Sequence, residues 1–332
     1  MNVTIFGTGT WAMALARVLS DNGHNLLLIG KDEQQVNELN TSHTNRKYFD
    51  TSVELPKHVN ATLSIEEGVA FSDYLLIAVP SSNFKALLET IRPLLQNKKY
   101  IINTTKGFDS VSKQRLSDVV RQTLPRHVVK GIVSLLGPSH AEEVIHRQLT
   151  LISATIQRVD HAQDVANLFA NTYFRVYVQK DEIGAEVGAA LKNVIAIASG
   201  VITGLGLGDN ARAALVTRGL TELMRLGKAL GGKLKTHTGL TGLGDLIVTS
   251  YSPHSRNYQA GIKIGQDDTA TTFLKENKRT IEGIPFAKIA HDLAQKYKLR
   301  LPIIEAVYAV LYEKKKPSEM VKFLMNRPLK IE

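Results

Sequence analysis

A glycine-rich turn near the start of the chain constrains its fold more than any other feature. The apolar run Val3–Phe6 leads directly into residues 7–12, which form a G-x-G-x-x-A pattern. Gly7 permits a tight turn, Gly9 leaves the backbone open to a pyrophosphate, and the small Ala12 lets a helix pack close to the strand. The N–H groups and dipole at the start of that helix would face the phosphates. The pattern therefore predicts a dinucleotide site.

The surrounding sequence separates this turn from a chance match. Residues 206–211 fit the same pattern, but they follow the Ala-rich helical run 191–200, so we expect a loop between helices there. The N-terminal copy is followed by a helix that ends at residues 21–23 and by a second apolar run, Asn25–Gly30. This order completes a βαβ unit.

Strand-like and helical stretches alternate through the first half of the chain. The apolar runs are Val3–Phe6, Leu26–Ile29, Tyr74–Val79, Tyr100–Asn103, Ile132–Leu136, Thr150–Thr155 and Phe174–Val178. This alternation predicts an α/β fold with a doubly wound, mostly parallel sheet covered by helices. Ligands of such sheets bind beyond the carboxyl ends of the strands, so we expect the loops there to share a crevice with the glycine turn.

Helical periodicity dominates the second half. Its segments are Ile183–Gly200, Ala211–Leu230, Ser255–Ile264, Pro285–Tyr297 and Pro302–Tyr312, with a stop at Gly231-Gly232. For 332 residues, two domains is the ordinary expectation. We therefore predict a Rossmann domain over residues 1–181 that binds NAD(P) and an all-α substrate-binding and catalytic domain over residues 182–332.

Composition narrows the classes of partner and chemistry. The net charge of +10 favours anionic partners, such as nucleic acid, acidic membranes or phosphorylated small molecules. The cationic run Lys314–Lys316 is interpreted as a solvated helix end. No secretory leader is visible, and the longest uncharged run, Asn193–Gly208, is too short and polar to span a bilayer. We expect a cytoplasmic protein without stable membrane insertion.

Several catalytic classes find no support. The absence of cysteine excludes disulfides, thiolate nucleophiles and cysteine metal ligands. A single Glu-x-x-His pair, Glu143 and His146, has no second copy, so we predict no metal site. No G-x-S-x-G elbow is present, which leaves a serine hydrolase unsupported.

Lys192 is the most informative residue outside the glycine turn. Its helical neighbours are small or apolar, including Gly188, Ala189 and Ala196. A lysine in such a setting usually extends its amine to water. Here the small neighbours leave room for a ligand, and partial desolvation would lower the lysine pKa toward a range useful for proton transfer. We therefore hypothesise that Lys192 is a general acid/base.

Two loops at predicted strand ends carry further candidates. Lys106 follows the run Tyr100–Asn103, where it would face the crevice, although an exposed loop lysine is the common alternative. Ser139 opens an S-x-x-E capping box after Gly137-Pro138, and we expect it to cap a helix. The start of a helix at a strand end is also an anion site.

The helical half offers a carboxylate and a cationic helix start. The glycine-rich loop 239–246 presents Asp245. Ser255 is the expected N-cap of a helix whose first turn holds Arg256 and Asn257. A cation at a helix N-terminus opposes the dipole, so an anionic ligand would rationalise Arg256, although a solvated arginine is the ordinary alternative.

Taken together, these motifs resemble one family. The motifs are Gly7-x-Gly9-x-x-Ala12, Lys106, Gly137-Pro138-Ser139, Leu191-Lys192-Asn193, Gly242-x-Gly244-Asp245-Leu246 and Ser255-Arg256-Asn257. The chain resembles the bacterial NAD(P)-dependent glycerol-3-phosphate dehydrogenases over nearly its whole length. The resemblance implies a helical domain like the C-terminal domain of 6-phosphogluconate dehydrogenase. It also implies reversible reduction of dihydroxyacetone phosphate to sn-glycerol 3-phosphate, which feeds glycerophospholipid synthesis.

The resemblance also implies residue roles. Lys192 would be the proton donor and acceptor, with Lys106 and Asp245 around the same centre. Substrate ligands would be Lys106, Gly137, Ser139, Lys192, Asp245, Ser255, Arg256 and Asn257. The cofactor would be lined by Gly7, Gly9, Thr10, Trp11, Ala12, Lys31, Lys106, Ala141, Arg256, Thr280 and Glu282.

The end of the second predicted strand bears on the choice of cofactor. An acidic residue directly at this point usually binds the ribose 2′-OH of NAD, whereas a cation suits the 2′-phosphate of NADP. Here Lys31 comes first and Asp32 follows it. We predict that NADPH is preferred and that NADH is usable.

Two other functions remain open at this stage. A β-hydroxyacid or 6-phosphogluconate-type dehydrogenase would share the two-domain plan and a catalytic lysine. A non-catalytic NAD(P)-sensing or nucleic-acid-binding protein would use the fold and the basic charge, but it would leave Lys106, Lys192 and Asp245 unexplained. We expect a small-molecule substrate and no nucleic acid, with a homodimer as the candidate assembly.

Overall fold

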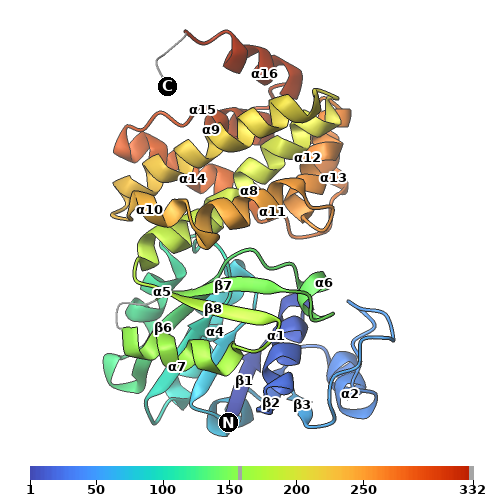
Figure 1. Ribbon diagram of the computed structural model, residues 1–332, viewed down its shortest axis with the longest axis vertical. Coiled ribbons are helices and arrows are strands. Elements are labelled where there is room, and N and C mark those ends of the chain that lie inside the picture. Colours follow the sequence, from blue (N-terminus) through green and yellow to red (C-terminus); the bar gives the residue numbers. More distant parts are fainter. Residues whose placement is uncertain (156–158, 329–332) are drawn as a thin grey trace. The chain divides into compact units, whose positions relative to one another are not determined.

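The computed structural model describes residues 1–155 and 159–328, and the chain divides into two compact units, Met1–Glu182 (unit 1) and Ile183–Glu332 (unit 2). Unit 1 combines a sheet with helices on both faces, and unit 2 is helical (Figure 1). The predicted fold class is therefore confirmed.

In the described part of unit 1, eight strands form one sheet in the order β3-β2-β1-β4-β5-β6-β7-β8. Their bounds are β1 Asn2–Phe6, β2 Asn25–Ile29, β3 Val59–Thr62, β4 Tyr74–Ile77, β5 Lys99–Asn103, β6 Val129–Leu136, β7 Thr150–Thr155 and β8 Phe174–Gln179. Neighbouring strands are parallel except for the antiparallel pair β6 and β7. The sequence analysis overlooked β3, because its four residues hold only two apolar side chains.

Alternating side chains of the central strands supply two hydrophobic cores. On β4, Leu76 belongs to the core shared with α1, whereas Leu75 and Ile77 belong to the core shared with α4. This two-faced burial is typical of parallel sheets in α/β proteins. The helices and short helical turns of unit 1 are α1 Thr10–Asp21, α2 Glu33–Thr41, α3 Ile65–Phe71, α4 Ser81–Ile91, η1 Arg92–Leu94, α5 Leu116–Thr123, η2 Arg126–Val128, α6 Ala141–Val144 and α7 Val159–Phe169.

Unit 2 is built around the long helix α8. The first residue of this helix, Glu182, still belongs to unit 1. The elements are α8 Glu182–Gly204, α9 Gly208–Ala229, α10 Leu234–His237, η3 Leu240–Gly244, α11 Asp245–Tyr251, α12 Arg256–Gln266, α13 Thr271–Glu276, α14 Gly283–Tyr297, α15 Pro302–Tyr312 and α16 Pro317–Met325. By length and composition α8 could cross a membrane, yet 83% of its most apolar 18-residue window is buried within the chain. This burial is typical of a core helix.

Helices α8 and α12 approach each other closely through glycines. A Cβ atom at Gly200 would lie 2.1 Å from the carbonyl oxygen of Tyr258, and one at Gly261 would lie 2.1 Å from that of Ile197. Larger residues would force the two backbones apart. The glycines therefore hold the start of α12, which carries Ser255–Asn257, against the helix that carries Lys192.

Two loops differ in detail from the sequence expectation. Residues 205–207 do connect two helices, but α9 already begins at Gly208, so Asp209–Ala211 are helical. The expected glycine-rich loop before Asp245 is a π-helical turn, Leu240–Gly244, that runs directly into α11. Close packing explains it, because a Cβ atom at Gly242 would lie 2.1 Å from the carbonyl oxygen of His237.

Candidate functional site

The glycine turn of unit 1 has the geometry that its sequence indicates. Gly7 has φ +126°, and a Cβ atom there would lie 2.6 Å from the carbonyl oxygen of Ala78 at the end of β4. A Cβ atom at Gly9 would meet nothing within 4 Å, and Ala12 is fully buried against the sheet. The turn is thus packed tightly on the protein side and open on the other.

This turn fits a bound dinucleotide. Helix α1 begins at Thr10, and its N-cap, Gly9, supplies no side-chain hydrogen bond to the first-turn N–H groups. Such groups are a ready site for phosphate oxygens. The buried indole Nε1 of Trp11 also has no hydrogen-bond partner among the described residues. Both observations suit a polar ligand that lies along the turn.

The two charged residues after β2 differ in their exposure and contacts. Lys31 is exposed, whereas the carboxylate of Asp32 caps α2 by accepting hydrogen bonds from the backbone N–H groups of Gln34 and Gln35. Asp32 also forms an ion pair of 3.1 Å with Lys47, and the hydrogen bond from Lys47 is the largest cause of the lowered pKa of Asp32. The Asp32 carboxylate is therefore already engaged by partners within unit 1.

The strand-end loops of unit 1 bring Lys106 and Gly137 together. The Lys106 amine donates a 2.9 Å hydrogen bond to the carbonyl oxygen of Gly137, a residue with φ +147°. The capping role predicted for Ser139 is wrong, because His140 is the N-cap of the four-residue helix α6. The Ser139 hydroxyl instead donates to the Gly137 carbonyl oxygen at 3.0 Å, within the turn. Ala141 is the buried first residue of α6.

In unit 2, Lys192 lies at the centre of a buried polar cluster. Its side chain is 6% exposed, and its amine donates a short hydrogen bond to the Asp245 carboxylate, which is 1% exposed. The amine also donates to Thr249 Oγ1 at 2.8 Å. The Thr249 hydroxyl donates in turn to the Asp245 carbonyl oxygen at 2.6 Å. Of the three residues expected around one centre, the structure brings Lys192 and Asp245 into contact, and the shared centre with Lys106 stays a prediction.

A second polar cluster joins the starts of α12 and α14. Ser255 is the N-cap of α12, as predicted, and accepts a hydrogen bond from the Tyr258 N–H group. The Asn257 Oδ1 atom accepts from the Gly283 N–H group at 2.8 Å, and Glu282 accepts from Asn193 at 3.1 Å. Arg256 and Thr280 are exposed.

Two family descriptions match the chain. NAD-dependent glycerol-3-phosphate dehydrogenase N-terminus matches residues 2–162, and the C-terminus of the same enzyme matches residues 181–322. A glycerol-3-phosphate dehydrogenase [NAD(P)+] from Staphylococcus saprophyticus is 45% identical over 331 residues, which cover 99% of each chain. The chain belongs to the NAD-dependent glycerol-3-phosphate dehydrogenase family.

Other members of this family agree. A glycerol-3-phosphate dehydrogenase [NAD(P)+] from Bacillus cereus is 42% identical over 330 residues, covering 99% of this chain and 97% of the relative. The crystal structure of the glycerol-3-phosphate dehydrogenase from Coxiella burnetii is 34% identical and superimposes with a TM-score of 0.92, covering 98% of this chain and 99% of the other. The sequence-based family assignment is therefore confirmed.

The sequence analysis missed two contributors to these clusters. Thr249 contacts both Lys192 and Asp245, and it lies four residues after Asp245 on α11. The i, i+4 spacing would have indicated it if the segment had been expected to be helical. Asn193 was noted in a motif but given no role, although it contacts Glu282.

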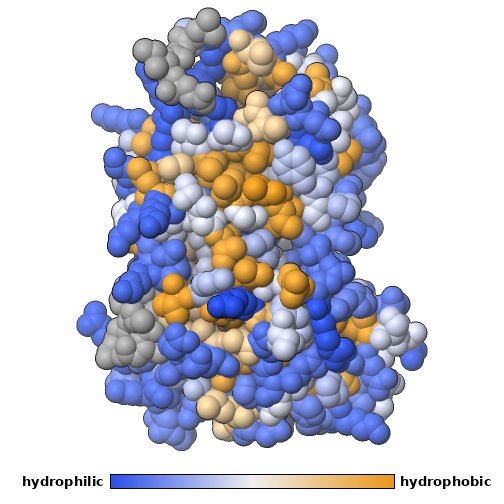
Figure 2. Space-filling model, in the orientation of Figure 1, coloured by the Kyte–Doolittle hydropathy of each residue, from blue (hydrophilic) through white to orange (hydrophobic). Residues whose placement is uncertain are grey.

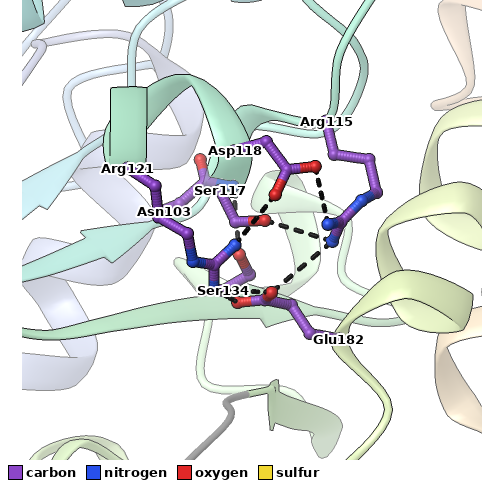
Figure 3. A network of polar contacts seen from close by, with 7 residues as sticks. All are labelled: Asn103, Arg115, Ser117, Asp118, Arg121, Ser134 and Glu182. Atoms are coloured by element: carbon purple, nitrogen blue, oxygen red, sulfur yellow. Dashed lines mark hydrogen bonds and ion pairs between the residues drawn. The ribbon is translucent and has the colours of Figure 1, made fainter. Parts of the chain in front are cut away.

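The sequence analysis also did not predict an ion-pair network in unit 1 around the buried carboxylate of Glu182 (Figure 3). Glu182, which is 4% exposed, accepts two hydrogen bonds from Arg121 at 2.7 and 2.8 Å. Arg115 lies 3.5 Å from the same carboxylate, and both arginines pair with Asp118. Glu182 is the first residue of α8 and the last residue of unit 1, so the network holds the end of this unit in place.

Proposed function

We propose that the chain reduces dihydroxyacetone phosphate to sn-glycerol 3-phosphate by hydride transfer from NAD(P)H, and that it also runs the reverse reaction. The observation that carries this proposal is the buried contact of Lys192 with Asp245 and Thr249 in a member of this family. Unit 1 is assigned to the cofactor, and unit 2 supplies the catalytic lysine.

The chemistry requires a proton donor at the substrate carbonyl. A bound nicotinamide supplies the hydride that C2 of the substrate receives. Negative charge then develops on the C2 oxygen, where the Lys192 ammonium neutralises it and donates a proton to form the hydroxyl group. Asp245 and Thr249 hold the amine in one position, which removes the cost of orienting it during the reaction. In the oxidative direction, the neutral amine of Lys192 accepts the proton.

The remaining polar residues are assigned to substrate binding. Arg256 is exposed in the first turn of α12, where its guanidinium and the positive end of the helix dipole suit a phosphate. We assign Ser255 and Asn257 to the same role. Lys106, Gly137 and Ser139 form the corresponding polar loops of unit 1. Lys106 also supplies a positive charge for the substrate.

The cofactor is assigned to the glycine turn and its surroundings. Gly7, Gly9 and Ala12 shape the turn, while Thr10 and Trp11 present polar groups along it. Lys31 is the ligand for a 2′-phosphate, so NADPH is preferred over NADH. By family pattern we also assign Lys106, Ala141, Arg256, Thr280 and Glu282 to the nucleotide. We further propose that the enzyme is cytoplasmic and supplies glycerol phosphate for phospholipid synthesis.

A spectrophotometric assay of NADPH oxidation tests this proposal. Purified protein is given dihydroxyacetone phosphate, unphosphorylated dihydroxyacetone, or a β-keto acid. Rapid oxidation with the phosphorylated ketone alone supports the proposal. Oxidation with the β-keto acid alone would assign the chain to the β-hydroxyacid dehydrogenases. Binding to DNA at moderate salt, with no oxidation of NADPH by any ketone, would favour a non-catalytic role.

A further inference from the structure

Unit 2 contains a cavity of 800 Å³ that none of the proposed catalytic residues lines. Four helices contribute to its wall: α8, α9, α15 and α16. It is partly open to solvent, since several of its lining residues are exposed. Ligand pockets typically enclose roughly 300–1,000 Å³, so the cavity has the size of a binding site.

The wall of the cavity is apolar, and each helix presents one face to it. On α8 the lining residues are Ile197, Ala198, Val201 and Ile202. On α15, Ile303, Ala306, Val307 and Val310 recur at helical spacing along one face. Figure 2 shows hydrophobic side chains gathered on the visible face of unit 2, with hydrophilic ones around them. An apolar chain is the occupant that such a wall favours.

Cations surround this apolar wall. Arg218 and Arg225 are exposed on α9, Lys298 and Arg300 are exposed between α14 and α15, and Arg327 follows α16. The guanidinium of Arg225 is held by a 3.2 Å hydrogen bond to the carbonyl oxygen of Arg300. Like charges at this density oppose the docking of a second copy of the same face. They attract an anionic group instead.

One carboxylate, that of Glu222, also lines the cavity, but it is engaged by backbone N–H groups of the wall. Glu222 is 2% exposed and accepts hydrogen bonds from the N–H groups of Ile303 and Ile304, at 2.8 and 3.0 Å. These bonds satisfy the start of α15, where Pro302 is the first residue. Five basic side chains against one engaged carboxylate leave the cavity positively charged.

We propose that this cavity binds a fatty-acid anion, with the acyl chain between α8 and α15 and the carboxylate at the arginines of α9. The apolar wall matches a single alkyl chain, and guanidinium groups pair with carboxylates through two parallel hydrogen bonds. This site is separate from the Lys192 cluster, so its existence does not depend on the proposed dehydrogenase activity.

Isothermal titration of the full-length protein with dodecanoate, below its micellar concentration, tests the proposal. We expect saturable binding to one site, weaker binding of decanoate by roughly tenfold for the two missing methylenes, and weaker binding at higher salt. Dodecanol has the same chain without the charge, and we expect at least tenfold weaker binding. Equal affinity for the acid and the alcohol would overturn the assignment of the cations.

Substitutions at exposed positions distinguish dodecanoate binding in this cavity from non-specific association with the protein surface. Arg225→Glu should weaken dodecanoate binding at least tenfold, and Ala214→Trp, at an exposed lining position of α9, should block it. Lys228→Glu changes the same charge on α9 outside the cavity and should leave affinity unchanged. The proposal fails if all three variants bind alike. It also fails if the protein binds anionic vesicles but not monomeric dodecanoate, or if it forms a dimer that Ala214→Trp dissociates.

Discussion

The Lys192 amine donates hydrogen bonds to both Asp245 and Thr249, although these residues lie more than fifty positions further along the chain. The contact joins α8 to α11, and all three side chains are buried. A buried ammonium is tolerated only when a carboxylate and further hydrogen bonds compensate for its lost hydration. The cluster therefore combines a fixed position for the amine with a charge that the fold can sustain.

Replacing Lys192 by arginine should strongly slow turnover without unfolding the protein. Arginine preserves the positive charge beside Asp245, but its guanidinium does not release a proton at accessible pH. We expect Lys192→Arg to lower kcat on the order of 10²-fold to 10⁴-fold. Thermal unfolding followed by circular dichroism should show a retained cooperative transition. A variant with near-normal kcat would exclude proton transfer by this residue.

Thr249→Val should impair the same step through position rather than chemistry. The substitution keeps the shape of the side chain but removes the hydroxyl that accepts a hydrogen bond from Lys192. We expect kcat to fall about tenfold, with little change in KM for NADPH, because the glycine turn is untouched. Thr249→Ser retains the hydroxyl and should recover most of the activity. If the valine and serine variants behave alike, the hydroxyl has no positioning role.

The cofactor preference should depend on Lys31. Removing its charge in Lys31→Ala eliminates a charge-assisted contact to the 2′-phosphate, so kcat/KM for NADPH should fall roughly tenfold. The value for NADH should stay nearly constant, because NADH lacks that phosphate. Lys57→Ala, at another exposed lysine of unit 1, is the matched control. A wild-type kcat/KM for NADH that equals or exceeds the value for NADPH would contradict the predicted preference.

Local patterns along the chain were sufficient to predict most of the elements but not all of the contacts. The strand–glycine–helix order predicted β1, α1 and β2 because each local preference agrees with the fold. The π-helical turn before Asp245 was missed, because tertiary packing of Gly242 against His237, and not local propensity, determines it. The capping box at Ser139 failed for a local reason, since the hydroxyl donates to the carbonyl oxygen of Gly137, two residues earlier in the same turn.

The ion-pair network around Glu182 illustrates the same limit. Nothing in the sequence marks Arg115, Arg121 or Glu182 as paired, and only the fold brings the two guanidinium groups to the buried Glu182 carboxylate. Long-range pairs of this kind leave no periodic pattern. The sequence shows which of these residues are positive and which negative, but it does not show which of them form ion pairs.

Arg121→Ala should destabilise unit 1 through this network. The variant leaves the buried Glu182 carboxylate with the more distant Arg115, and breaking buried pairs is costly. We expect the free energy of unfolding, measured by urea denaturation, to fall by about 2 kcal/mol. Arg126→Ala, at an exposed arginine nearby, should change it by less than about 0.5 kcal/mol. Equal stability of the two variants would show that the network contributes no net stabilisation.

Stability should depend on pH through Glu222. Burial raises the pKa of this carboxyl from 4.5 to about 7, although the N–H groups of Ile303 and Ile304 act in the opposite direction. Between these two values the folded protein holds a proton that the unfolded chain has released. The contribution of the neutral carboxyl is therefore complete below about pH 4.5 and is lost as the pH rises to 7.

Glu222→Gln removes this titration and isolates its effect. As the pH rises from about 4 to about 8, the wild type should lose about 3 kcal/mol of unfolding free energy relative to the variant. Urea denaturation at several pH values measures it, with the exposed Glu319→Gln as the control. A wild-type-minus-variant difference that is flat over this range would mean that Glu222 has the same pKa in the folded and unfolded states. The two backbone hydrogen bonds from α15 would then offset the cost of burying its charge.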